Sequence, residues 1–307
     1  MTNILVTTSS FAENDIEPLD LLKKAGLNVV VNPYGRTLTE NEISALVKEY
    51  DPIAVIAGVE PITRAVLSQS SRLKIISRCG VGMSNIDLDS AREFGVAVYN
   101  TPDALTEAVA ELAIALILNL LRRVSEADRN MRNGTWKKLM GKLLFGKTVG
   151  IVGCGRIGTK LAEYVESFGC IVIGYDPLLK SHDRIKLVPR EELLNRSDII
   201  TLHLPVSGET KNMVDVDFLT AMKNESYIVN TARGELIDEV ALHAALTSGK
   251  LAGAALDTFK NEPYSGPLSA LDNVVLTSHM GSYAREAREI MEFQSVKNLL
   301  NGLGEIK

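Results

Sequence analysis

The sequence predicts an α/β protein built from two doubly wound parallel sheets, and three observations predict it. The chain has 307 residues, more than one hydrophobic core usually serves and enough for about two domains. Short apolar, β-branched runs alternate with amphipathic helical stretches, which is typical of βαβ units. The alternation occurs twice, in one series before an apolar helix near the middle of the chain and in a second series after it.

The first series predicts a parallel sheet with both faces covered by helices. Its strands are predicted at Ile4–Thr7, Val29–Asn32, Ala54–Ala57, Lys74–Ser77 and Val96–Tyr99. Its helices are predicted at Glu17–Ala25, Glu40–Tyr50, Arg64–Ser68 and Asp89–Phe94.

The helix predicted at Thr106–Arg123 is rich in alanine and leucine. A helix this apolar has to be covered nearly all round. Burial between two domains would do this, and so would a second subunit. The helix therefore suggests a homodimer, with burial inside one chain as the alternative.

The second series begins after Gly146 and predicts a second parallel sheet. Its strands are predicted at Thr148–Val152, Ile171–Tyr175, Ile199–Leu202, Tyr227–Asn230, Gly253–Leu256 and Val274–Leu276. Its helices are predicted at Thr159–Ser167, Arg190–Asn195, Val216–Ala221 and Glu239–Ser248. A last amphipathic helix, Ala284–Leu300, follows the final strand and needs a packing surface, for which the first domain is a candidate.

Composition excludes several classes of function. The 33 Lys and Arg residues against 38 Asp and Glu give a net charge of −5, so no global field attracts nucleic acid or an anionic membrane surface. Three cysteines without C-x-x-C spacing argue against a disulfide framework or a cysteine zinc site, and four histidines form no metal-binding pattern. No metal is expected. Without a signal-peptide pattern or an apolar run of about 20 residues, the expected location is the cytoplasm.

A glycine-rich turn stands where a dinucleotide-binding loop requires it, between a strand and a helix. Gly153, Gly155 and Gly158 form the pattern G-x-G-x-x-G, and Asp176 ends the next strand 18 residues beyond Gly158. The glycines would allow a tight turn, close approach of a diphosphate and close helix packing, while Asp176 would accept hydrogen bonds from ribose hydroxyls. No arginine follows directly to bind a 2′-phosphate. NAD is therefore favoured over NADP; the alternative is a purely structural turn.

Three polar side chains follow three strands of the second series, and ligands bind outside the carboxyl ends of such strands. Arg233 has a planar guanidinium that matches a carboxylate or a keto-acid edge. His279 can exchange a proton near neutral pH, and Glu262 could fix its tautomer and stabilise the imidazolium. Singly, each could be a surface ion pair or a structural hydrogen bonder. Together, beside a dinucleotide loop, they favour a catalytic interpretation.

In the first series, Gly80-Val81-Gly82 follows a predicted strand. Flexible backbone there could present a nest of N–H groups to a small anion. An ordinary turn between strand and helix is the alternative.

With these motifs in place, the chain resembles the NAD-dependent D-2-hydroxyacid dehydrogenases, most closely their 3-phosphoglycerate dehydrogenase-like branch. The resemblance covers essentially the whole chain. It rests on the glycine loop with Asp176 and on five further segments: His203-Leu204-Pro205, Asn230–Gly234, Asp257, Glu262-Pro263 and Ser278-His279.

The resemblance implies a role for each matching residue. Arg233, Glu262 and His279 would be the catalytic set, and Asp257 would bind the nicotinamide carboxamide. The implied cofactor-binding residues are Gly153, Gly155, Arg156, Ile157, Gly158, Asp176, His203, Pro205, Thr231, Ala232, Asp257 and His279. The implied substrate-binding residues are Arg78, Val81, Gly82 and Arg233, with Val81 and Gly82 giving backbone amides to the substrate carboxylate.

The resemblance also implies the domain layout. A flavodoxin-like substrate domain would be discontinuous, formed by 1–99 plus 284–307, and a Rossmann NAD-binding domain would span 100–283. The chain ends at Lys307, without the C-terminal regulatory domain of many phosphoglycerate dehydrogenases. Serine feedback through such a domain is therefore not expected.

Departures from the phosphoglycerate branch concern the substrate. Ser84 stands where that branch usually has Asp, and Ala57-Gly58-Val59-Glu60 occupies the region of its phosphate-binding arginine. A carboxylate at Glu60 would repel a phosphate if it faced the pocket. Arg78 instead favours a phosphorylated substrate. So does the run from Arg122 to Lys147, which has eight Lys or Arg against two Asp or Glu. That run is either a solvated basic face or a set of cations that reach a partner subunit's pocket.

The expected function is hydride transfer between NAD and C2 of a small D-2-hydroxy or 2-keto acid, with 3-phosphoglycerate among the candidates. The alternatives are a glyoxylate, hydroxypyruvate or phosphonate activity, and an NAD(H)-sensing binding protein like the corepressors of this superfamily. Formate dehydrogenase fits less well, because it pairs its histidine with glutamine and this chain offers Glu262.

Overall fold

The computed structural model describes residues 2–102 and 104–305. The chain divides into two compact units, Met1–Leu105 with Ser282–Lys307, and Thr106–Gly281. We call them the first and the second unit. The boundaries predicted from the sequence lie at 99/100 and 283/284.

The first unit contains a five-stranded parallel sheet in the order β2-β1-β3-β4-β5, which is the flavodoxin-like strand order. The strands are β1 (Asn3–Val6), β2 (Asn28–Val31), β3 (Ala54–Ala57), β4 (Ile75–Arg78) and β5 (Ala97–Tyr99). The order reverses between β1 and β3. In sheets of this kind ligands bind outside the carboxyl ends of the strands at that point.

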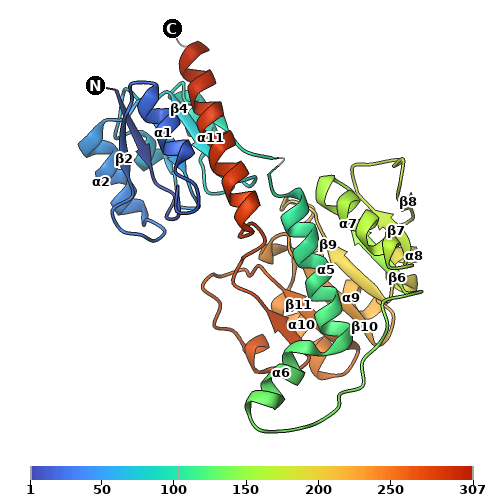
Figure 1. Cartoon of the computed structure of the whole chain (residues 1–307). Coiled ribbons are helices and arrows are strands. Elements are labelled where there is room, and N and C mark those ends of the chain that lie inside the picture. Colours follow the sequence, from blue (N-terminus) through green and yellow to red (C-terminus); the bar gives the residue numbers. More distant parts are fainter. Residues whose placement is uncertain (1, 103, 306–307) are drawn as a thin grey trace. The chain divides into compact units, whose positions relative to one another are not determined.

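Helices cover both faces of the first sheet. On one face, α11 (Arg285–Glu305) packs against α1 (Glu17–Lys24) and against β3, β4 and β5, as Figure 1 shows for α1, α11 and β4. The other face carries α2 (Glu40–Tyr50), α3 (Arg64–Leu67) and α4 (Leu88–Glu93). A capping box between Thr39 and Glu42 starts α2, and it satisfies backbone N–H groups that the first turn cannot pair.

The second unit contains a seven-stranded parallel sheet in the order β12-β11-β10-β9-β6-β7-β8. This is the classic dinucleotide-binding order with one strand added at an edge. The strands are β6 (Thr148–Val152), β7 (Ile171–Tyr175), β8 (Lys186–Leu187), β9 (Ile199–Leu202), β10 (Ser226–Asn230), β11 (Leu251–Leu256) and β12 (Val274–Leu276). The order reverses between β6 and β9.

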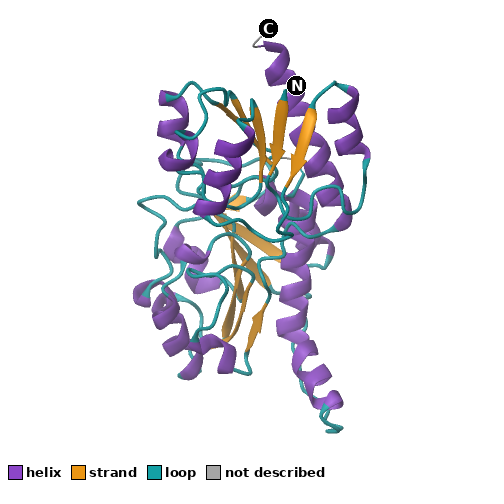
Figure 2. Ribbon diagram, turned by 90° about the vertical axis from the view of Figure 1, so that its left-hand side faces the viewer, coloured by secondary structure: helices purple, strands orange, loops and turns teal. Residues whose placement is uncertain are grey.

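Helices also cover both faces of the second sheet, so that in each unit the strands lie between helices (Figure 2). One face carries α5 (Thr106–Arg122) and α7 (Arg156–Ser167), which pack against each other. The other carries α8 (Arg190–Arg196), α9 (Val216–Ala221) and α10 (Glu239–Thr247). Short 3₁₀ turns lie at Gly234–Leu236 and Pro267–Ala270. The predicted fold class, two doubly wound parallel-sheet domains, is confirmed.

Two elements were not expected from the sequence. Strand β8 has only two residues, which is too short to give an apolar pattern. Helix α6 (Val124–Arg132) has no buried residue, and it starts after Arg123 in the left-handed conformation (φ 54°). Among the described residues, no helix has the length and apolar character to cross a membrane.

Candidate active site

The turn after β6 contains three glycines, and at two of them, Gly153 and Gly158, a Cβ would clash with backbone. Gly153 has φ +100°, and a Cβ there would lie 2.6 Å from the carbonyl carbon of His203. A Cβ on Gly158 would lie 2.1 Å from the carbonyl oxygen of Gly153, so α7 approaches the turn closely. A Cβ on Gly155 would meet nothing within 4 Å. Gly155 is the N-cap of α7 and has no side chain to cap it. The turn therefore leaves space for a diphosphate at a helix N-terminus.

Asp176 connects the end of β7 to this turn. One carboxylate oxygen accepts the N–H of Cys154 at 2.9 Å, and the other accepts the N–H of Leu178 at 2.9 Å. These bonds orient the carboxylate beside the glycine turn, where ribose hydroxyls would reach its remaining lone pairs. Arg184, the first arginine after Asp176, donates to Glu166 at 2.6 Å. Asp176 and the glycine turn thus fit NAD.

Polar atoms without partners lie after β9, β10 and β11. They are His203 Nδ1, Thr231 Oγ1 and Thr258 Oγ1, each buried and without a hydrogen-bond partner among the described residues. Buried polar atoms of folded proteins are normally paired, so this edge suits a polar ligand. Burial lowers the pKa of His203 to about 4, and its Nε2 lies 2.9 Å from Thr201 Oγ1. The ring is therefore neutral at neutral pH. Pro205 and Ala232 follow the same strands, β9 and β10.

Glu262 and His279 are brought together, with Oε2 of Glu262 2.8 Å from Nδ1 of His279. The other carboxylate oxygen of Glu262 accepts the N–H of Phe259 at 3.0 Å, which fixes its orientation. A carboxylate can only accept, so Nδ1 of His279 carries the proton. Both side chains are partly exposed. The ring's Nε2 is therefore the atom left to exchange a proton with a ligand.

The loop that carries His279 is held by Asp257, which is buried at the end of β11. One oxygen of Asp257 accepts from Thr277 Oγ1 at 2.5 Å and from the N–H of Met280 at 2.8 Å. The other accepts the N–H of Gly281 at 2.9 Å. His279 itself has φ +54°, a conformation that non-glycine residues rarely adopt and that surrounding contacts must maintain. The contact of Asp257 with a nicotinamide carboxamide stays a prediction.

Arg233 lies in a short turn after β10 that Asn230 closes. The side chain of Asn230 accepts the N–H of Ala232 at 3.0 Å and donates to the carbonyl of Arg233 at 2.8 Å. A Cβ on Gly234 would lie 1.9 Å from the carbonyl carbon of Phe259. The Arg233 turn therefore packs directly against the segment that orients Glu262. Sequence reasoning missed Asn230 as a positioning residue; an amide at a strand end was the only signal.

The predicted substrate-binding residues Arg78, Val81 and Gly82 lie in the first unit, at the end of β4 and in the turn after it. Gly80 has φ +146°, and a Cβ there would overlap the guanidinium of Arg78, which folds back to the carbonyl of Cys79. Asn100 donates to the carbonyl of Val81 at 2.9 Å. The turn is thus held from β5, and the backbone of residues 80–82 keeps a defined path.

Glu60 points into the first unit. It is 1% exposed, and its Oε1 accepts from Thr7 Oγ1 and from the N–H of Gly58. Thr7 and Gly58 follow β1 and β3, so the carboxylate fills the position where the strand order reverses. Its charge is used inside this unit.

The chain is similar to known proteins over nearly its whole length. Residues 114–281 match the family described as D-isomer specific 2-hydroxyacid dehydrogenase, NAD binding domain. The D-3-phosphoglycerate dehydrogenase of Methanocaldococcus jannaschii is 39% identical over 276 residues, which cover 86% of this chain and 52% of that protein. The hydroxypyruvate reductase of Thermotoga maritima is 36% identical over 301 residues, which cover 94% of this chain and 97% of that protein.

Among solved structures, the TT0316 protein of Thermus thermophilus superposes with a TM-score of 0.92 at 38% identity, over 99% of this chain and 97% of that one. The chain spans about half of the phosphoglycerate dehydrogenase that it matches. A family match over more than half of the chain agrees with the glycine turn, Asp176 and the strand order of the second unit. The chain therefore belongs to the D-isomer-specific 2-hydroxyacid dehydrogenases, and its second unit is their NAD-binding domain.

Proposed function

We propose that the protein transfers hydride reversibly between NAD and C2 of a small D-2-hydroxy acid or the corresponding 2-keto acid. The observation that carries this proposal is the contact of 2.8 Å between Glu262 and His279, at the carboxyl edge of the sheet that carries the glycine turn. When bound, the nicotinamide supplies a hydride acceptor or donor. The chain has to supply the proton and the orientation.

His279 is the proposed acid and base. With Nδ1–H held by Glu262, its Nε2 takes the hydroxyl proton during oxidation and returns it during reduction. The negative charge of Glu262 stabilises the imidazolium, and the Phe259 N–H keeps that carboxylate in place. Asp257 holds the loop that carries the ring.

Arg233 is the proposed anchor for the substrate. Its guanidinium can hold the carboxylate and polarise the C2 oxygen as negative charge develops there. The rigid turn closed by Asn230 supports this assignment. Arg78 and the backbone amides of Val81 and Gly82 are the proposed substrate-binding groups of the first unit.

The test is turnover of NADH with a panel of 2-keto acids. We expect activity with the wild type, and we expect His279→Ala to lose a factor of about 10²–10⁴ in turnover while it still binds NADH. Full activity of His279→Ala would refute the assignment. Binding of NADH without turnover of any acid would favour the NAD(H)-sensing protein instead.

For the substrate, we propose an unphosphorylated acid such as hydroxypyruvate or glyoxylate over 3-phosphohydroxypyruvate. The segment Ala57–Glu60 contains no cation, so it offers a phosphate no charged partner. The test is the ratio of kcat/KM for hydroxypyruvate and 3-phosphohydroxypyruvate. A preference for the phosphorylated acid would return 3-phosphoglycerate to first place.

We further propose that the protein is a cytoplasmic homodimer. Large apolar side chains on the segment after α6 are open to solvent, with Trp136 81% and Met140 88% exposed. Contiguous exposed apolar surface marks an interface more often than a free surface. A cytoplasmic location is supported by the free thiols of Cys79, Cys154 and Cys170.

A further inference from the structure

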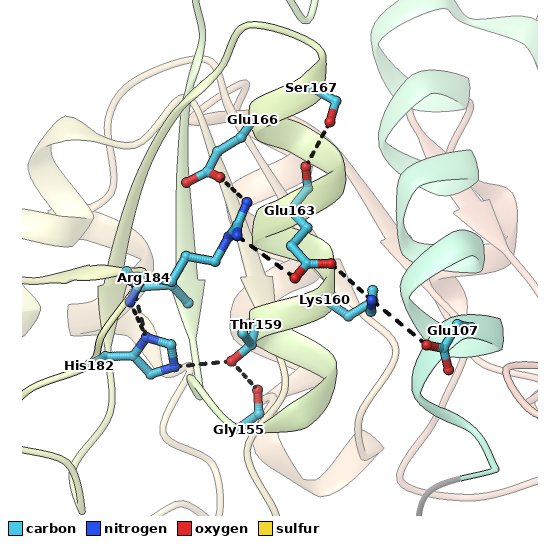
Figure 3. Close-up of polar contacts among 10 residues, drawn as sticks. Glu107, Gly155, Thr159, Lys160, Glu163, Glu166, Ser167, His182 and Arg184 are labelled. Carbon is cyan, nitrogen blue, oxygen red and sulfur yellow. Dashed lines mark hydrogen bonds and ion pairs between the residues drawn. The ribbon is translucent and has the colours of Figure 1, made fainter.

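The loop between β7 and β8 begins with Asp176 and is fastened to α7 at two points (Figure 3). Near its middle, His182 contacts Thr159 in the first turn of α7, with 3.0 Å between Nε2 and Oγ1. Further along, Arg184 donates to Glu166 at 2.6 Å and lies 3.8 Å from Glu163. Most side chains of the loop are exposed, so these contacts, together with buried Ile185, hold its path.

The contacts of His182 fix the tautomer of its neutral ring. Its Nδ1 accepts the backbone N–H groups of Arg184 and Ile185, each at 3.1 Å. A nitrogen that accepts cannot carry a proton, so the proton of the neutral ring lies on Nε2. His182 therefore donates to Thr159.

Thr159 passes this contact on to the glycine turn. Its hydroxyl oxygen lies 2.8 Å from the carbonyl oxygen of Gly155. The single hydroxyl proton is used in that bond, which leaves a lone pair for the N–H of His182. One chain of hydrogen bonds thus runs from the β7–β8 loop through Thr159 to Gly155. Its two ends are the loop that begins at Asp176 and the turn that leaves space for a diphosphate.

We propose that His182, as the neutral Nε2–H tautomer, is a positioning residue for the adenosine half of NAD. It holds the loop after Asp176 against the first turn of α7, so that the ribose-binding carboxylate and the diphosphate turn keep a fixed relation before the cofactor arrives. Order in the free protein lowers the cost of ordering on binding. The proposal rests on NAD binding by the second unit and is independent of the substrate.

The first experiment measures the dissociation constant of NADH by its fluorescence. We expect His182→Ala to weaken NADH about tenfold, the scale of one or two net hydrogen bonds, and to leave kcat at saturating NADH unchanged. The matched control is His243→Ala. His243 lies on α10, which covers the face of the sheet opposite α7. Its backbone carbonyl accepts from Thr247, a bond that the substitution keeps. We expect no change of NADH affinity in the control.

The second experiment divides the cofactor. We expect His182→Ala to weaken ADP-ribose by the same factor and nicotinamide mononucleotide not at all. Equal losses for both fragments, or an unchanged affinity for NADH, would overturn the proposal. Failure of the wild type to bind NADH would instead contradict the NAD assignment of the second unit.

The third experiment tests the hydrogen bond between His182 and Thr159 itself. His182→Gln keeps an amide N–H donor and should bind ADP-ribose more tightly than His182→Ala. Thr159→Val removes the acceptor hydroxyl and should weaken ADP-ribose about as much as His182→Ala does. Unchanged affinity in Thr159→Val, or no recovery in His182→Gln, would show that this contact does not hold the loop.

Discussion

At the scale of single residues, the two carboxylate oxygens of Glu262 have different partners. Oε1 accepts a backbone N–H, whereas Oε2 faces the imidazole of His279. Glu262→Gln keeps a side chain of the same shape but removes the charge that stabilises the imidazolium. We expect kcat for keto-acid reduction to fall about 10²-fold, with NADH affinity unchanged, as measured by steady-state kinetics and NADH titration.

The control for this variant is Glu239→Gln. Glu239 also accepts a backbone N–H from the same segment, that of Lys260 at 3.0 Å, and no contact with His279 is among its described bonds. Its kcat should stay within about twofold of the wild type. Equal losses in the two variants would mean that Glu262 supports the fold of this segment and not the proton transfer.

His203 makes the stability of the second unit depend on pH. Burial lowers its pKa from 6.5 to about 4 in the folded protein. As the pH falls through about 6.5, His203 is protonated in the unfolded chain but stays neutral in the folded chain. The stability from the neutral ring is therefore complete above that pH and is lost progressively toward about pH 4. His203→Gln, which can keep a bond to Thr201, should show a smaller loss of urea-unfolding midpoint between about pH 7 and about pH 5.

The result that would contradict this assignment is an unchanged pH dependence in His203→Gln. His243→Gln is the matched control, because His243 lies on α10 of the same unit with a side chain that is only partly buried. The control should follow the wild type at both pH values.

The contact between Glu262 and His279 could be anticipated from sequence, but the bonds that orient these side chains could not. Arg233, Glu262 and His279 each follow a strand, and the ends of parallel strands meet at one edge of a sheet. Asp257 is different, because its three bonds reach Thr277, Met280 and Gly281 across a turn whose path depends on the whole loop. Glu60 is a second case. Whether it faced a ligand or the interior depended on Thr7, which is 53 positions away in sequence.

At the scale of elements, the junction of β6 and α7 separates stability from cofactor binding. Gly155 has backbone angles open to alanine, φ −76° and ψ −161°, and free space before its Cβ. Gly155→Ala should therefore fold with an unchanged unfolding temperature. Because the methyl group would take the space in front of the helix N-terminus, NADH should bind at least about tenfold more weakly.

Gly158→Ala is the contrasting variant. Its Cβ would stand 2.1 Å from the Gly153 carbonyl oxygen, so α7 would have to move away from the turn. We expect a loss of stability of about 1–3 kcal/mol, seen in urea unfolding, in addition to weak NADH binding. If Gly155→Ala unfolds as easily as Gly158→Ala, the space before Gly155 is not reserved for a ligand.

Helix α11 carries two pairs of arginine and glutamate with the same spacing but different burial. Arg288 and Glu292 lie 2.8 Å apart with side chains 9% and 2% exposed, whereas Arg285, which pairs with Glu289 at 2.9 Å, is 70% exposed. Burial raises the pKa of Glu292. Arg288→Met would leave that carboxylate without its cation, so we expect the free energy of unfolding to fall by about 3 kcal/mol.

Arg285→Met is the matched control, because exposed pairs contribute only about 0.2–1 kcal/mol. Both variants are compared by urea unfolding followed by circular dichroism. Because protonation of Glu292 removes the unpaired charge, part of the loss in Arg288→Met should disappear as the pH is lowered. Equal effects of the two substitutions would show that the buried pair contributes no more than the exposed one.

Elements were predicted with the correct bounds where the sequence carries a clear apolar run or a helix cap. The strand at Thr148–Val152 and the helix at Glu40–Tyr50 have the predicted bounds, because every strand residue packs on a covered sheet and the helix starts at a capping box. α6 was missed although Val124, Ala127 and Met131 recur at helical spacing, and none of its residues is buried. The first turn of α7 was also missed, since Arg156–Gly158 was assigned to the glycine turn and the helix begins directly at its end.

At the scale of the whole molecule, the last helix of the chain completes the first unit. α11 is the last helix in sequence, yet it packs on β3, β4 and β5 of the first unit. The apolar residues Met291, Val296 and Leu299 complete the core of that unit. The amphipathic pattern of the helix indicated that it needed a surface. Only the packing of these residues identifies which sheet provides it.

The exposed segment after α6 gives the prediction that concerns the assembled protein. Trp136 and Met140 are large, apolar and open to solvent, and Met140 lines a pocket of about 460 Å³ together with Leu121, Arg123 and Tyr227 among others. A second copy of the chain would cover both the segment and the pocket. We expect sedimentation equilibrium to give a mass of about twice 33.4 kDa.

Charge placed in this segment should break the dimer, because an interface core excludes unpaired charges. We expect the double variant Trp136→Asp with Met140→Asp to sediment as a single chain with its helix content unchanged. Val240→Asp is the control, since Val240 is 80% exposed on α10 of the same unit and should leave the mass unchanged. A wild type that sediments as a single chain would contradict the homodimer, and dissociation of the control would show that the segment after α6 is not the specific contact.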